Sequence, residues 1–153
     1  MVGQRRLGFG RAILTFALAY VIITALAFGL YEIIAAATGM HAAQPMKDPA
    51  YLLAEKYYPL LNLAVWVAGG WLYFRRRSGS SGNAKEALWL GAFWLLVALP
   101  VDLIGFVLIP NPLSLNAHDF YVGQFPWIYL TYLAVFIGPT SYVGLARLFT
   151  AST

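Results

Sequence analysis

Four apolar runs, each close to the length of a membrane crossing, restrict the fold of this chain more than any other feature. They occupy residues 12–37, 57–74, 86–109 and 126–149. A helix needs about 20 mainly apolar residues to span the hydrocarbon of a bilayer. Across all 153 residues, 61% are hydrophobic and only 10% charged, which is far from the average soluble domain. The sequence therefore predicts an all-α membrane protein, a four-transmembrane-helix bundle that forms one domain over residues 1–153.

The first run follows Arg5, Arg6 and Arg11, an arrangement that secretory signal peptides share. The apolar core of a signal peptide is only about 7–15 residues long, however. The run at 12–37 is clearly longer, so we expect it to stay in the protein as the first transmembrane helix.

The positions of the lysines and arginines predict the orientation of the chain. Arg5, Arg6, Arg11, Arg75, Arg76, Arg77, Lys85 and Arg147 flank the spans on one side, and Lys47 and Lys56 flank them on the other. Membrane proteins keep the more basic flanks in the cytoplasm. We therefore expect an integral, multi-pass protein with both termini cytoplasmic. A flexible basic loop at 75–85 lies on the same side, and polar connectors at 38–55 and 111–125 lie on the other.

Composition also excludes several classes of function. The chain has no cysteine, so it forms no disulfide and no thiolate metal site. Its net charge of +4 comes from residues that flank apolar runs, which argues against nucleic acid as a partner. His118 lies in a connector without metal-ligand spacing, and no cofactor motif is present. We expect neither a metal nor another cofactor.

Asp102 is the strongest candidate for a functional residue, because it interrupts the third apolar run. A charge inside hydrocarbon costs several kcal/mol, so such a residue normally faces the protein interior or a wet cavity. The alternative is purely structural: the carboxyl group is protonated or hydrogen-bonded and holds helices together. The sequence leaves both open.

Other polar side chains lie at a depth similar to that of Asp102, in the half of each run that faces away from the cytoplasm. Asp102 shares a helical face with Gly91 and Ala98, and Glu32 shares one with Gly29. Small residues beside a polar group are typical of close packing between membrane helices. We therefore expect Asp102 and Glu32 to point inward and to share a hydrated cavity.

The candidate site combines these acids with amide, aromatic and imidazole groups from other segments. The candidate ligand-binding residues are Asp102, Glu32, Asn62, Trp66, Tyr129, Tyr132 and His118. Each of these residues also has a simpler structural interpretation. Glu32 would be exposed near the surface, Asn62 would hydrogen-bond between helices, and His118 would be solvated. The aromatic residues would lie in interfacial belts or pack in the interior.

The hypothesis that fits best is membrane-embedded binding of an amphipathic or cationic small molecule or lipid, in an outer-facing pocket of carboxylates and aromatic rings. A proton-coupled transporter is one alternative. An acid/base enzyme of the isomerase or cyclase type, with Asp102 and Glu32 as catalytic residues and a hydrophobic substrate, is another. The chain could also be an assembly subunit of a membrane complex, and its small-residue faces would permit a homodimer.

Overall fold

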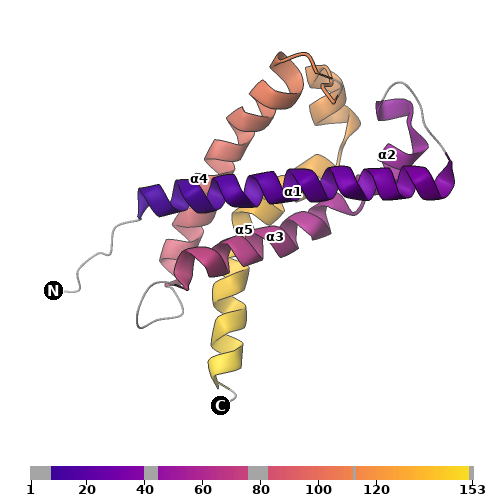
Figure 1. Ribbon diagram of the computed structural model, residues 1–153. Coiled ribbons are helices and arrows are strands. Elements are labelled where there is room, and N and C mark those ends of the chain that lie inside the picture. Colours follow the sequence, from indigo (N-terminus) through magenta and orange to yellow (C-terminus); the bar gives the residue numbers. More distant parts are fainter. Residues whose placement is uncertain (1–7, 40–44, 76–82, 112, 152–153) are drawn as a thin grey trace.

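The computed structural model describes residues 8–39, 45–75, 83–111 and 113–151, and every regular element within them is a helix (Figure 1). The prediction of an all-α chain is confirmed. The longer helices are α1 (Phe9–Thr38), α3 (Tyr58–Phe74), α4 (Ala84–Asp102) and α5 (Trp127–Ala151). The shorter elements are η1 (Pro45–Lys47), α2 (Pro49–Ala54), η2 (Leu103–Leu108) and η3 (Asp119–Gly123). Both connectors that the sequence presents as polar loops thus contain short helices.

Three helical segments are long and apolar enough to cross a membrane: Phe9–Thr38, Ala84–Leu108 and Trp127–Phe149. Much of their surface is exposed, and it carries large apolar side chains such as Leu14, Leu96 and Leu148. Lipid solvates such surfaces, whereas water would not. The chain is therefore a multi-pass membrane protein by length, composition and surface.

Helix α3 is the central element of the bundle, because it packs against both α1 and α5. α1 and α3 run alongside each other in opposite directions, and α4 packs against α5 on the other side (Figure 1). The C-terminal part of α5 extends away from the other helices, at the bottom of Figure 1. The interior is filled by fully buried side chains that include Trp66, Trp94, Tyr73 and Leu90.

Glycines set how closely α5 approaches its neighbours. A Cβ atom at Gly91 of α4 would lie 2.0 Å from the carbonyl oxygen of Phe136 in α5. A Cβ atom at Gly138 of α5 would lie 2.6 Å from the Cβ of Trp66 in α3. Real Cβ atoms do not come this close. The backbones of α4 and α5 are therefore in contact at the first crossing, and the backbone of α5 contacts both the Cβ and the backbone of Trp66 at the second. Close approach through small residues is how membrane helices gain packing energy.

Tyr73 connects three helices at one end of the bundle through hydrogen bonds. Its hydroxyl accepts a hydrogen bond from the backbone N–H of Gly8 at 3.2 Å and donates one to Oε1 of Glu86 at 3.2 Å. Its carbonyl oxygen accepts a bond from Nη1 of Arg11 at 3.1 Å. The beginning of α1, the end of α3 and the beginning of α4 therefore lie at the same end, which we call the basic end.

Candidate functional site

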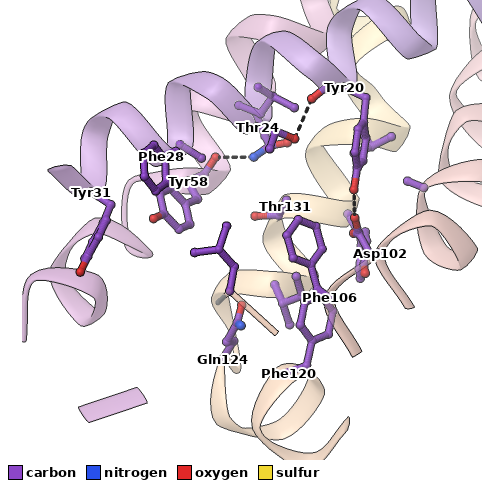
Figure 2. Close-up of a pocket in the computed structure, with 18 of the residues that line it drawn as sticks. Tyr20, Thr24, Phe28, Tyr31, Tyr58, Asp102, Phe106, Phe120, Gln124 and Thr131 are labelled. Atoms are coloured by element: carbon purple, nitrogen blue, oxygen red, sulfur yellow. Dashed lines mark hydrogen bonds between the residues drawn. The ribbon is translucent and has the colours of Figure 1, made fainter. Parts of the chain in front are cut away.

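A cavity of about 310 Å³ lies in the half of the protein away from the basic end. Residues of α1, α3, α4 and α5 line it, and α2, η2, η3 and the segments next to them contribute the rest of the wall. Figure 2 shows Tyr20 and Asp102 at one side of the cavity and Tyr31 and Tyr58 at the other. Its volume is about twice that of the roughly 150 Å³ cavity in which an engineered protein binds benzene. A ligand of about a dozen non-hydrogen atoms would fit by that comparison.

Asp102 and two tyrosines form the polar group at one side of the cavity. The hydroxyl of Tyr20 in α1 donates a hydrogen bond to Oδ1 of Asp102 in α4. The side chain of Tyr132 in α5 is only 7% exposed and faces the same carboxyl group. Its hydroxyl lies close enough to interact with this carboxyl group but makes no well-aligned hydrogen bond to any described residue. A buried polar atom without a partner costs about 1–3 kcal/mol, so the hydroxyl of Tyr132 is ready to bond a polar group of a ligand.

The helix changes its geometry at Asp102. Pro100, which has no N–H to donate, lies two residues before it, and the π-helical element η2 begins directly after it. The N–H of Ile109 closes this element on the carbonyl oxygen of Ile104 at 3.0 Å. Single turns of π-helix often occur at functional sites, because they widen the helix and shift side chains out of register. This irregularity presents Asp102 and Phe106 to the same cavity.

The other side of the cavity is a closed polar wall built on Asp48. This carboxylate is 1% exposed, and its Oδ1 accepts a bond from the N–H of Ala50 at 2.9 Å as the N-cap of α2. Its Oδ2 accepts a bond from the hydroxyl of Tyr31 in α1 at 2.8 Å. The cap therefore ties the end of α1 to α2. Asp followed by Pro49 is a strong signal for a helix start, and it could have identified this residue from the sequence.

Asn62 and Trp66 line the cavity as predicted, but their polar atoms are used within α3. The indole Nε1 of Trp66 donates to Oδ1 of Asn62 at 3.0 Å, and Nδ2 of Asn62 donates to the carbonyl oxygen of Tyr58 at 2.9 Å. The ring of Trp66 also packs against Phe16 and Trp94. These two residues therefore offer a ligand an apolar surface rather than free hydrogen-bonding groups.

The structure does not bring Glu32, Tyr129 or His118 into the cavity. The side chain of Glu32 is exposed, and the expected pairing of Glu32 with Asp102 is absent among the described residues. α1 turns Ala27 and Tyr31 toward the cavity, and one further residue rotates a helical side chain by about 100°. Tyr129 is exposed beside Phe125, and His118 is 77% exposed next to Asp119.

The charge of the cavity wall is acidic. Asp48 and Asp102 line it, and none of its described lining residues is lysine, arginine or histidine. Within the described part of the chain, no three His, Cys, Asp or Glu side chains gather as metal ligands would. The cavity therefore suits a positively charged or hydrogen-bond-donating group better than an anion.

Glu55, next to this wall at the end of α2, gives the fold a dependence on pH. Burial raises the pKa of its carboxyl group from 4.5 to about 7, although the adjacent Lys56 opposes this. The carboxylate also faces the hydroxyls of Tyr51 and Tyr58, and its Oε2 is buried without a described partner. Ionisation of Glu55 is therefore unfavourable in the folded protein.

We expect the folded state to lose stability as the pH rises from about 4.5 to about 7, because only the unfolded chain gives up the Glu55 proton in that interval. Above both pKa values the loss is constant, at roughly 2 kcal/mol after allowance for contact with water. Glu55→Gln should remove it. Thermal unfolding in detergent at pH 4.5 and pH 8 measures the difference, and an equal pH dependence in both proteins would show that Glu55 is not the cause.

No protein family, curated protein or solved structure compared with the chain matches it. What the protein does is therefore inferred from its own residues.

Proposed function

We propose that the protein binds an amphipathic or cationic small molecule or lipid within the membrane, in the cavity around Asp102. The observation that carries this proposal is that Asp102 and the hydroxyl of Tyr132 lie together in an otherwise largely apolar cavity. This hydroxyl makes no well-aligned hydrogen bond to a described residue. Ligand pockets are typically apolar hollows of about 300–1,000 Å³ with a few well-placed polar groups. Both the volume and the lining of this cavity agree with that description.

Electrostatics favours a cation or a hydrogen-bond donor as the polar part of the ligand. A carboxylate in a low-dielectric site attracts an ammonium group more strongly than it would in water, and hydrogen bonds to charged groups contribute about 1.5–3 kcal/mol. The aromatic rings of Tyr20 and Phe106 line the same space and would add cation–π attraction.

The proposal is tested by mass spectrometry of the molecules that copurify with the protein in mild detergent. We expect bound molecules in the wild type, reduced occupancy in Asp102→Asn, and wild-type occupancy in the matched control Glu32→Gln, whose site lies outside the cavity. If Asp102→Asn carries the same molecules at the same occupancy as the wild type, the cavity around Asp102 is not the binding site.

A proton-coupled transporter is the second candidate, and the broken helix at Asp102 favours it. Irregular helices beside an intramembrane acid are typical of transporters, where they allow a change of access. Such a protein would show pH-driven flux in liposomes that Asp102→Asn abolishes. The acid/base enzyme has less support, because Glu32 lies outside the cavity and both oxygens of Asp48 are already hydrogen-bonded.

We further propose that α3 is a fourth span, with both termini and the segment between α3 and α4 in the cytoplasm. α3 has 17 residues, about 26 Å of helix, which is somewhat short for the hydrocarbon layer of about 30 Å. Its position between α1 and α5 supports a crossing, because α1 and α3 run in opposite directions. The distribution of lysine and arginine supports the orientation.

Single cysteines test this topology cleanly, since the chain has none of its own. In intact cells a membrane-impermeant thiol reagent should label Lys47→Cys, in the connector before α3, and leave Ser80→Cys, after α3, unlabelled until the cells are opened. Labelling of both positions in intact cells would mean that α3 does not place them on opposite sides of the membrane.

A further inference from the structure

Building on the proposed function, we infer that the ligand is a single-chain amphiphile with a hydrogen-bond-donating head, and that it reaches the cavity sideways from the bilayer. The head lies at Asp102 and Tyr132, and the chain passes between Phe28 of α1 and Leu113 after η2. Four observations carry this inference: a closed polar wall, an apolar opening, the linkage between α1 and α4, and the size of the cavity.

The polar wall closes the cavity on the side of the two connectors. Asp48 is hydrogen-bonded to α1 and α2 and is nearly inaccessible. Gln124 and Phe120, at and near the end of η3, are also buried although they line the cavity. A water-soluble ligand approaching from this side would have to break the bond between Tyr31 and Asp48. Apart from the edge at Leu113, the described parts of the connectors therefore cover this side of the cavity.

Two of the apolar side chains that line the cavity are exposed at the surface of the protein, which indicates that the cavity opens beside them. Phe28 is 49% exposed and Leu113 is 46% exposed, and both line the cavity. Thr24, one helical turn before Phe28, is exposed as well and uses its hydroxyl on the carbonyl oxygen of Tyr20. On the α1 side, at Phe28, such an opening faces hydrocarbon, because water would be poorly accommodated beside exposed apolar side chains of a membrane helix.

The bond between Tyr20 and Asp102 lies further along α1 toward the basic end than this opening does (Figure 2). It joins α1 to α4, whereas α1 has no extensive packing against η2 or η3 in the described structure. A molecule that enters between Phe28 and Leu113 therefore meets Asp102 at the inner end of its path. This order suits a polar head that leads and an apolar chain that trails into the lipid.

The size of the cavity fits a short chain. By comparison with the benzene-binding cavity, about a dozen non-hydrogen atoms fill 310 Å³, which corresponds to a decyl chain with one head atom. Phe106, Ile128 and Val135 line the cavity as the surface that such a chain would contact. Longer chains would extend through the opening.

The chemistry of the head group is tested with three decyl compounds. Their binding to the protein in lipid nanodiscs is measured by native mass spectrometry. Decylamine and decanol, which donate hydrogen bonds, should bind to the wild type, and decanoate should not, because its carboxylate would lie beside Asp102. Decanoate binding as well as decylamine does would overturn the inference about the head. If none of the compounds binds although the wild type still carries copurified molecules, the inference fails and the proposed function stands; if the wild type carries no bound molecule either, both fail.

The route is tested by narrowing the opening. Phe28→Cys is modified with N-benzylmaleimide, and the exchange of bound decylamine for its deuterated form is followed. We expect exchange at least tenfold slower than in the wild type. Modification of Phe28→Cys with a methylthio group, which is smaller than the native side chain, should leave the rate unchanged. Ile33→Cys, equally on α1 and exposed but outside the cavity, should exchange at the wild-type rate when carrying the benzyl adduct.

Equal exchange rates in the two benzyl-modified proteins would overturn the lateral route. They would leave the binding site itself standing, because binding of decylamine to the wild type is measured separately. The two failures are therefore distinguishable in the same set of samples.

Discussion

Gly91→Ala is expected to destabilise the protein by about 3 kcal/mol or more, well beyond the usual cost of one added methyl group. The new Cβ would lie 2.0 Å from the carbonyl oxygen of Phe136 and 2.9 Å from its carbonyl carbon. Both are backbone atoms of α5, so no side-chain rotation can relieve the clash, and α4 and α5 must separate. Because total stabilities are only about 5–15 kcal/mol, thermal unfolding in detergent should show a large decrease in the midpoint.

Gly144→Ala is the matched control for this prediction. Gly144 also lies in α5, and a Cβ there would meet no atom within 4 Å. Alanine has the higher helix propensity, so we expect this variant to unfold at or slightly above the wild-type temperature. If the two variants unfold at the same temperature, α4 and α5 do not cross at Gly91 as the structure shows.

Asp102→Leu is expected to weaken binding of decylamine by about a hundredfold. The substitution removes a charge-assisted hydrogen bond of about 1.5–3 kcal/mol, and every 1.4 kcal/mol is a factor of ten in affinity. It also leaves the hydroxyl of Tyr20 without its acceptor, so part of the effect is a less ordered site. Asp102→Asn keeps the volume and an acceptor oxygen, and we expect it to bind with intermediate affinity.

The affinity is measured by equilibrium titration of decylamine in mild detergent at constant pH and salt. Glu32→Leu removes a carboxylate of similar chemistry from outside the cavity, and its affinity should equal that of the wild type. A stability measurement on each variant separates loss of binding from loss of fold. Wild-type affinity in a folded Asp102→Leu protein would exclude the carboxylate as the anchor of the ligand.

The sequence was most informative where one residue contrasts with everything around it. Asp102 stands out in an apolar run, and the buried face of α4 contains Gly91 and Ala98 as the spacing predicted. The apolar runs likewise indicated where long helices lie, since backbone groups in hydrocarbon must bond within their own segment.

The direction in which Glu32 points could not be predicted in this way. α1 is apolar on nearly every side, so its composition does not distinguish the face that packs from the face that meets lipid. The stripe through Gly29 and Glu32 and the one through Ala27 and Tyr31 differ by a rotation of about 100°. Contacts with α3 and α4 decide between them, and those contacts are tertiary.

The second acid of the cavity was missed for a different reason. Asp48 comes from a connector, and its distance in space from Asp102 depends on how α2 folds back against α1. The sequence Asp48-Pro49 predicts the start of α2, but it does not predict that Asp48 lies in the cavity wall. The close helix contacts at Gly138 of α5 and Gly70 of α3 could not be predicted for the same reason. A glycine in the sequence does not show which helix will pack against it.

Photochemical crosslinking tests the central claim, that the cavity around Asp102 binds an amphiphile, most directly. The probe is decylamine with a diazirine in its chain, irradiated with the protein in nanodiscs and mapped by peptide mass spectrometry. We expect adducts on cavity residues of α5 such as Ile128, Thr131 and Val135, and their loss in Asp102→Leu. Adducts confined to lipid-facing residues such as Leu96 and Leu148, and unchanged in Asp102→Leu, would contradict the claim.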